Sequence, residues 1–209
     1  TFDYLDTKIR IMRASFTGEL GYEIYVPPKY ALELWEKIFR NGKNLGLIPY
    51  GTETMHLLRA EKGYVVVGQD TDGTVTPIDL NLNWMIGKNK KDFVGKRSLS
   101  RSDTSRKDRK QLVGILPVDK NKNIEEGQHV VEIKSLPGNI KEPIEYLGHI
   151  TSSYHSPTLK HCVAMALIKG GNQLMGKKIF VSKPNSSETV ESEIVNPVFL
   201  DPDNRRLLS

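Results

Sequence analysis

The stretch from Arg13 to Ile24, R-A-S-F-T-G-E-L-G-Y-E-I, constrains the fold most, because it interrupts a β-rich run with two glycines and then resumes it. Gly18 and Gly21 permit the positive φ or the close backbone approach that a tight connection needs. Apolar residues alternate on both sides, as in two antiparallel strands. These apolar residues are Ile9, Ile11, Phe16, Tyr22, Ile24 and Val26. The pattern predicts a β hairpin.

Glu23 comes just after the second glycine of this hairpin. Because successive side chains of a strand alternate, Glu23 is expected on the face opposite Tyr22 and Ile24. An ionised carboxylate there could accept hydrogen bonds from the edge of a heterocycle. A solvated Glu on an exposed face satisfies the same pattern. The hairpin alone leaves both interpretations open.

Two helices are predicted after the hairpin. Apolar residues recur at helical spacing from Tyr30 to Arg40, with prolines before this segment and a glycine after it. A second helix is expected from Thr52 to Lys62, where Thr52 could cap the amino end and Gly63 the carboxyl end. Tyr64 to Val67 then has the pattern of a buried strand. Strands and helices in this order favour a small α+β layer.

Residues 88–110 are rich in lysine and arginine, in a chain whose net charge is +5. The basic residues lack interleaved aromatics, and no zinc, helix-turn-helix or RNA-recognition signature accompanies them. Nucleic-acid binding is therefore disfavoured. The segment is predicted to be a basic linker or a subunit-contact surface.

Short β-rich runs separated by Gly, Pro and Asn follow the linker. They are Gln111–Leu116, His129–Ile133, Ile144–Ser153, Val163–Ile168 and Lys178–Val181. This spacing predicts an antiparallel barrel or sandwich. The expected domains are residues 1–87, a linker at 88–110, and residues 111–209.

Two later segments complete a recognisable pattern. Gly51–Gly68 has the sequence G-T-E-T-M-H-L-L-R-A-E-K-G-Y-V-V-V-G, and Gly148–Ile168 has G-H-I-T-S-S-Y-H-S-P-T-L-K-H-C-V-A-M-A-L-I. Together with the hairpin, these segments resemble the folate-dependent aminomethyltransferases, the glycine cleavage T-protein family. The resemblance spans almost the whole chain. It implies an α+β fold, with a ferredoxin-like α/β layer domain at 1–87 and a small antiparallel β-barrel domain at 111–209.

The resemblance also implies a binding site for tetrahydrofolate. In the family, the second carboxylate of the G-E-x-G-x-E-I motif hydrogen-bonds the pterin ring, and Glu23 occupies that position. Phe16 stands where the family commonly has Tyr, so the ring area is kept and the hydroxyl is lost. Three further residues are candidates for cofactor binding: Tyr22, Met55 and Tyr154.

Departures from the family pattern limit what can be assigned. Met55 and His56 replace an Arg-Asp pair whose Arg contacts folate in the family. The Asp that the family uses near the reactive folate nitrogen belongs to an earlier part of the fold, so no catalytic residue is assigned in this chain. Arg59 and Glu61 match a family pattern and are expected to be structural. Tyr154 is interpreted either as a residue at the mouth of the site or as a structural one.

Other chemistries are disfavoured by what the sequence lacks. The five histidines are scattered and Cys162 is the single cysteine, so neither a metal site nor a disulfide framework is expected. Cys162 lies in an alternating apolar run and is predicted to be a buried packing residue. No P-loop or G-x-G-x-x-G motif opens a helix. With no signal segment or membrane span apparent, a cytoplasmic location is expected.

These features support one main hypothesis, in which the chain is the folate-binding region of a hetero-oligomeric oxidase of N-methyl amines. It would trap the one-carbon unit of oxidative demethylation as 5,10-methylene-tetrahydrofolate, while other subunits or regions bind FAD, FMN and NAD. Because it starts at Thr1 without Met, the chain is expected to be part of a longer polypeptide. It has no flavin motif and is therefore expected to be inactive alone. The alternatives are a T-protein-type aminomethyltransferase or demethylase, and a non-catalytic folate-binding module.

Overall fold

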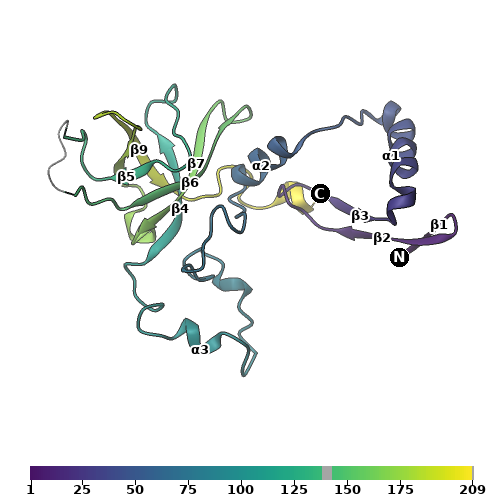
Figure 1. The fold of residues 1–209 in the computed structure, drawn as a ribbon, viewed down its shortest axis with the longest axis horizontal. Helices are drawn as coiled ribbons and strands as arrows, with labels where there is room; N and C mark the ends of the chain where they lie inside the picture. Colours follow the sequence, from purple (N-terminus) through teal and green to yellow (C-terminus); the bar gives the residue numbers. More distant parts are fainter. Residues whose placement is uncertain (138–142, 209) are drawn as a thin grey trace. The chain divides into compact units, whose positions relative to one another are not determined.

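The computed structural model of the chain describes residues 1–137 and 143–208 (Figure 1). The chain forms two compact units. The first combines Thr1–Arg59 with the residues from Asp201 onward, and the second is Ala60–Leu200. The domain ranges expected from the sequence, 1–87, 88–110 and 111–209, remain a prediction.

The first unit is built on an antiparallel sheet of β1 (Phe2–Tyr4), β2 (Thr7–Arg13) and β3 (Tyr22–Tyr25), in the order β1-β2-β3. The predicted hairpin corresponds to β2 and β3, although Phe16 lies in the connection and not in a strand. Both connection glycines are required by geometry. Gly18 has φ of +77°, and a Cβ at Gly21 would lie 2.8 Å from the Ala14 carbonyl oxygen.

Helix α1 (Pro28–Gly42) follows the sheet and begins with a proline in its first turn, where the missing N–H costs nothing. The apolar side of α1 and the face of β3 that carries Tyr22 and Ile24 line a common hollow of about 500 Å³. A 3₁₀ turn at Lys43–Leu45, helix α2 (Thr52–Glu61) and the short helix α4 (Arg205–Leu208) complete the helical part. Both predicted helices are thus present.

The predicted strand at Tyr64–Val67 is wrong. The segment is irregular, contains only an isolated bridge from Val67 to Thr71, and leaves Val67 86% exposed. Local hydrogen bonds explain the difference, because the Val66 N–H donates to the Asp70 carboxylate at 2.9 Å and the Val66 carbonyl accepts from the Asp70 N–H at 2.9 Å. A turn closed by backbone and side-chain hydrogen bonds between Val66 and Asp70 therefore replaces the strand ladder.

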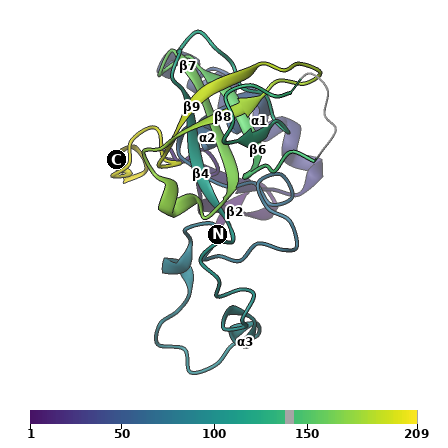
Figure 2. The ribbon, with the colours of Figure 1, turned by 90° about the vertical axis from the view of Figure 1, so that its left-hand side faces the viewer.

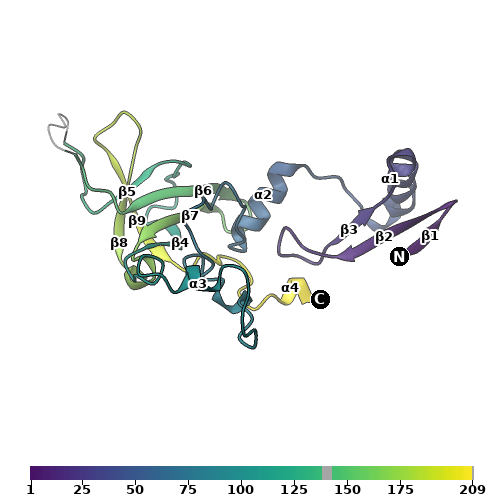
Figure 3. The ribbon, with the colours of Figure 1, turned by 60° about the horizontal axis from the view of Figure 1, so that its bottom comes forward.

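The second unit is a closed barrel with the strand order β4-β7-β6-β5-β8-β9, which antiparallel pairing of β4 with β9 closes (Figures 2 and 3). The strands are β4 (Lys110–Pro117), β5 (His129–Val131), β6 (Gly148–Ser156), β7 (His161–Lys169), β8 (Lys178–Ser182) and β9 (Thr189–Val195). Five of these match predicted runs. Strand β9 was not predicted, because its sequence T-V-E-S-E-I-V is half polar.

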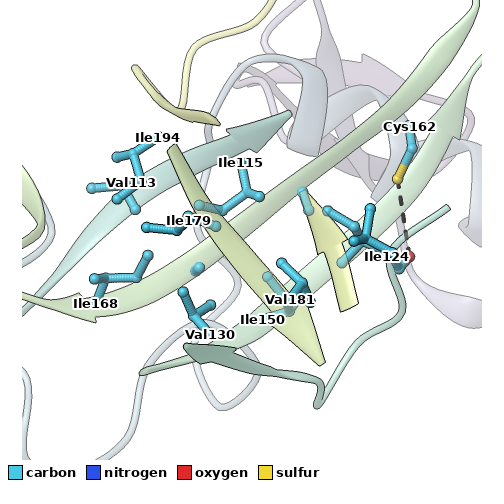
Figure 4. Close-up of a cluster of buried hydrophobic side chains, with 13 residues drawn as sticks. Val113, Ile115, Ile124, Val130, Ile150, Cys162, Ile168, Ile179, Val181 and Ile194 are labelled. Carbon is cyan, nitrogen blue, oxygen red and sulfur yellow. Dashed lines mark hydrogen bonds between the residues drawn. The ribbon is translucent and has the colours of Figure 1, made fainter. Parts of the chain in front are cut away.

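Aliphatic side chains fill the interior of the barrel (Figure 4). Val113, Ile115, Ile150 and Ile168 have no exposed surface. Cys162 belongs to the same cluster and is 2% exposed, which confirms its predicted packing role. Burying each such aliphatic side chain contributes about 1.5–3 kcal/mol, so the barrel interior is a stability element and not a ligand cavity.

A long irregular segment connects the Asp70 turn to β4. It contains a 3₁₀ turn at Asn83–Met85 and the four-residue helix α3 (Lys96–Leu99), and a further 3₁₀ turn at Gly171–Leu174 follows β7. None of the helices in the described ranges has the length and apolar character needed to cross a membrane. The predicted fold class, an α+β chain with an α/β layer followed by a small antiparallel barrel, is confirmed.

Candidate functional site

Strand β3 separates Tyr22 and Glu23 onto opposite faces of its sheet. Tyr22 and Ile24 line the hollow beside α1, so alternation directs Glu23 and Tyr25 to the other face. On that face Glu23 is paired in register with Met12 of β2. The predicted separation of Glu23 from Tyr22 and Ile24 therefore agrees with the strand geometry.

The Glu23 carboxylate is held by its neighbour two residues along the strand. The Tyr25 hydroxyl donates a hydrogen bond to Glu23 Oε2. This hydrogen bond, with the negative charge of Glu23, raises the pKa of Tyr25, because ionising a phenol beside a carboxylate is unfavourable. Both side chains are exposed. The contact thus orients a carboxylate that remains open to an incoming hydrogen-bond donor.

The other carboxylate of the motif, Glu19, has a different environment. Glu19 Oε1 accepts a hydrogen bond from Arg206 Nη1 of α4 at 3.1 Å, and its backbone carbonyl accepts one from Ser15 Oγ at 2.5 Å. Arg13 of β2 also reaches α4, donating to the Leu207 carbonyl at 2.9 Å. Glu19 therefore anchors the connection to the carboxyl-terminal helix, whereas Glu23 has no such tether among the interactions described. Arg206 was not predicted from the sequence as the partner of Glu19.

Aromatic rings meet where the hairpin connection approaches α2. The rings of Phe16 and His56 have centroids 5.8 Å apart and an interplanar angle of 87°, an edge-to-face contact. Met55 is the neighbouring residue on α2 and is half-buried. The histidine of the Met55-His56 pair thus packs against the Phe16 ring.

The five predicted binding residues do not all share one environment. Glu23, Phe16, Tyr22 and Met55 belong to the first compact unit, and Tyr22 is on the sheet face away from Glu23. Tyr154 is on β6 of the second unit, where it is half-buried and packs with a cluster that includes Ala60 and Met165. The roles of these residues in binding remain predictions.

Two buried carboxylates connect the other motif segments within the second unit. Asp70 is fully buried and accepts hydrogen bonds from Thr151 Oγ1 at 2.6 Å and Ser152 Oγ at 2.5 Å. Glu61 is 1% exposed, and its Oε1 accepts a hydrogen bond from Ser156 Oγ. The T-S-S-Y-H-S segment of β6 is therefore tied to residues 61–70 by carboxylate–hydroxyl pairs. These contacts agree with the expected structural role of Glu61, and Asp70 was missed.

Across residues 1–137 and 143–208, no three His, Cys, Asp or Glu side chains come together in a way that could hold a metal ion. The candidate site is thus an exposed carboxylate on a strand, close in sequence to an aromatic contact, and its chemistry is that of a hydrogen-bond acceptor.

Comparison with known families matches both parts of this architecture. Residues 1–90 match the GCVT N-terminal domain, and residues 110–201 match the glycine cleavage T-protein C-terminal barrel domain. The chain belongs to the glycine cleavage T-protein family.

Within this family, the chain is similar to α subunits of sarcosine oxidases. The chain is 44% identical to the sarcosine oxidase subunit alpha of Corynebacterium sp. strain U-96 and 46% identical to that of strain P-1. Each match covers 94% of this chain and 20% of the relative, so the chain spans about a fifth of those subunits.

Aminomethyltransferases are also similar to this chain. An aminomethyltransferase of Halothermothrix orenii is 34% identical over 88% of this chain and 48% of its own length. The crystal structure of the glycine cleavage system aminomethyltransferase T from Bartonella henselae matches with a TM-score of 0.77 and 24% identity, covering 93% of this chain and 50% of that one. The structural match shows the shared fold.

Proposed function

We propose that this chain is the folate-binding region of a sarcosine oxidase α subunit, and that Glu23 is its contact with the pterin ring. The observation that carries the proposal is the exposed Glu23 carboxylate, oriented by Tyr25 in a chain of this family. The amino-pyrimidine edge of a pterin offers paired N–H donors. An ionised carboxylate accepts such donors in charge-assisted hydrogen bonds, which are roughly twice as strong as neutral ones.

The reaction proposed for the complete assembly is capture of a one-carbon unit. Oxidation of sarcosine removes a hydride and leaves an iminium whose carbon is at the oxidation level of formaldehyde. The two nucleophilic nitrogens of tetrahydrofolate bond to this carbon to give 5,10-methylene-tetrahydrofolate, and its bond to the amine nitrogen breaks to release glycine. Holding folate near the site where this carbon emerges would replace a bimolecular encounter by a local one. The role of this chain is to bind and orient the pterin.

Other parts of the assembly supply the remaining chemistry in this proposal. Hydride removal requires an electron acceptor that side chains cannot provide, and FAD, FMN and NAD would be held by other regions or subunits. The carboxylate next to the reactive folate nitrogen would also come from another part of the polypeptide. This chain alone is therefore expected to be inactive as an oxidase.

The test compares Glu23→Gln with Glu19→Gln in the assembled enzyme. Glu23→Gln keeps the side-chain size but removes the charge and presents an amide donor to the donor edge of the pterin. Loss of a charged hydrogen bond predicts folate binding weaker by about 1.5–3 kcal/mol, or roughly 10- to 150-fold in Kd. Sarcosine consumption should continue at the normal rate, while free formaldehyde replaces methylene-tetrahydrofolate.

Glu19→Gln is the matched control, because Glu19 is engaged by Arg206 and not presented to a ligand. It should leave folate affinity and the product partition close to those of the unmodified enzyme. If both variants behave alike, or if Glu23→Gln leaves the partition unchanged, Glu23 is an ordinary surface carboxylate.

A second candidate function is aminomethyl transfer, which the similarity to the Halothermothrix orenii aminomethyltransferase favours. A transferase would receive its one-carbon unit from a lipoyl carrier, whereas the oxidase would associate with flavin-bearing subunits. Purification of the full-length protein from its native source distinguishes these by the partner obtained. A non-catalytic folate-binding module would still show folate affinity that depends on Glu23. It would purify with neither partner and would show no turnover.

A further inference from the structure

Apolar side chains gather on the irregular segment between the Asp70 turn and β4. Trp84 is 72% exposed, Met85 is 62% exposed, and Val94 is fully exposed. Single exposed apolar residues are common on protein surfaces, but a group of them around one depression marks an interaction site.

The depression is a hollow of about 630 Å³ within the second unit. Its walls include Val75, Leu80, Met85, Ile86, Phe93 and Val94. Four polar side chains, Thr71, Asp72, Thr76 and Lys90, also line the hollow. The apolar side chains outnumber them, so the hollow can receive a protruding apolar side chain. We call this hollow, together with residues 84–97 at its edge, the basic docking surface.

An ion-pair cluster fixes the backbone on both sides of this surface. The Arg109 guanidinium donates to the Asp79 carboxylate at 2.9 Å and to the Asp103 carboxylate at 2.9 Å, and it also donates to the Thr74 carbonyl. The side chains of Arg109 and Asp79 are only 10% and 3% exposed. Both ends of the segment are therefore held together, while α3 lies away from the barrel (Figures 1 and 2). A surface anchored in this way loses little conformational entropy on binding.

The edge of the surface is strongly positive. Residues 84–97 contain five basic residues, Lys88, Lys90, Lys91, Lys96 and Arg97, and a single acidic one, Asp92. All six are exposed. Charge complementarity therefore selects a partner whose contact region is acidic, and it accelerates the encounter with such a partner.

We propose that the basic docking surface binds an acidic segment of a separate polypeptide, which inserts an apolar side chain into the 630 Å³ hollow. The apolar walls favour a protein over a nucleic acid, because a phosphate backbone carries nothing to fill them. Met85 lines the hollow and is 62% exposed, so it can contact the inserted side chain directly. The inference is independent of the proposed folate contact, since it uses none of the residues of that site.

Site-specific photo-cross-linking tests the identity of the occupant. The full-length protein, in its native assembly, carries a benzoylphenylalanine in place of Val94, and a control protein carries it in place of Val118 on the barrel, which is 50% exposed. Position 94 should cross-link to a peptide of another polypeptide that is rich in Asp and Glu and has an apolar residue at the attachment point. Cross-links confined to the same polypeptide, to nucleic acid or to a basic peptide overturn the proposal, as does a yield no higher than at position 118.

Charge reversal then tests the energetics with the cross-linked partner. The triple variant Lys88→Glu, Lys90→Glu, Lys91→Glu should weaken binding at least tenfold and flatten its dependence on salt. The control variant Lys120→Glu, Lys122→Glu, Lys134→Glu changes the same net charge on exposed positions of the barrel unit. Equal weakening by both triple variants would show a non-specific effect of net charge and refute the assigned surface.

The melting temperature shows whether either triple variant has lost its fold. Met85→Ala, which removes an exposed apolar wall of the hollow, gives a second measurement that leaves the charge unchanged and should also weaken binding at least tenfold. Partner affinity unchanged by Met85→Ala contradicts the insertion part of the proposal. The partition between formaldehyde and methylene-tetrahydrofolate should be the same as in the unmodified enzyme, which separates this test from the test of Glu23.

Discussion

Substitution of Asp70 tests whether buried hydrogen bonds hold residues 61–70 against the T-S-S-Y-H-S segment of β6. Its carboxylate is fully buried and accepts hydrogen bonds from the Val66 N–H on one oxygen and from Thr151 and Ser152 on the other. Asp70→Asn keeps the shape of the side chain and changes only its charge and its donor pattern. The variant therefore isolates the electrostatic part of the contact.

The size of the effect follows from the geometry around the two oxygens. The amide oxygen of Asn is expected to remain with the Val66 N–H, because an amide donor facing that N–H would leave both unpaired. The NH₂ group then faces Thr151 and Ser152, whose hydroxyls can rotate to accept. All three hydrogen bonds lose their charge assistance, at a cost of about 0.7 kcal/mol each. We expect a loss of about 2 kcal/mol, which lowers Tm by roughly 4–8 °C for a unit of this size.

Calorimetry of the full-length chain measures this loss, and hydrogen exchange localises it. The Val66 amide should exchange up to about 30-fold faster in Asp70→Asn, because its local protection falls by the same free energy. Asp72→Asn is the matched control, since Asp72 is exposed and pairs only locally with Thr74, and its effect should stay below about 1 kcal/mol. If Asp70→Asn and Asp72→Asn shift Tm equally, the buried cluster is not what joins these segments.

Two further predictions concern the barrel. The pKa of His149 is lowered from 6.5, mainly by burial and to a smaller extent by the charges of Lys110 and His129. The unfolded chain therefore binds a proton at His149 more readily than the folded barrel does. Stability is therefore expected to fall as the pH drops below about 6.5. His149→Gln should reduce this dependence of Tm on pH. The control His155→Gln, at an exposed position, should leave it unchanged. A Cβ at Gly148 would lie 1.9 Å from a backbone carbonyl oxygen of β7, so Gly148→Ala is expected to cost about 3 kcal/mol in denaturant unfolding. Gly73→Ala, where a Cβ meets nothing within 4 Å, should be nearly neutral, and similar midpoints for the two alanine variants would contradict the expected steric clash.

Residues with the same local sequence signal can have different roles in the fold. Glu19 and Glu23 both belong to the G-E-x-G-x-E-I motif, yet Glu19 is bound by Arg206, which lies 187 residues along the chain. No local sequence pattern extends over 187 residues, so only the family resemblance distinguishes the two carboxylates in the sequence. The structure supplies a physical basis for it, since a carboxylate in an ion pair is less available to a ligand than an exposed one.

The Tyr64–Val67 segment is a case in which the local sequence pattern predicted the wrong conformation. Its apolar residues match a buried strand, but the Asp70 carboxylate takes the Val66 N–H and folds the segment into a turn. Asp70 does so because Thr151 and Ser152 hold its carboxylate from 81 and 82 residues away. A long-range contact thus decided a local conformation.

The sequence by itself determined the features that depend on neighbours along the chain. The hairpin around Gly18 and Gly21, the two helices and five of the barrel strands follow from backbone sterics and from the periodicity of apolar side chains. Only the tertiary structure decided the closure of the barrel through β9 and the pairing of buried carboxylates with hydroxyls. It also decided that exposed apolar residues surround the hollow beside the basic segment. These features depend on which distant residues meet, and that is set by the packing of the whole chain and not by any local pattern.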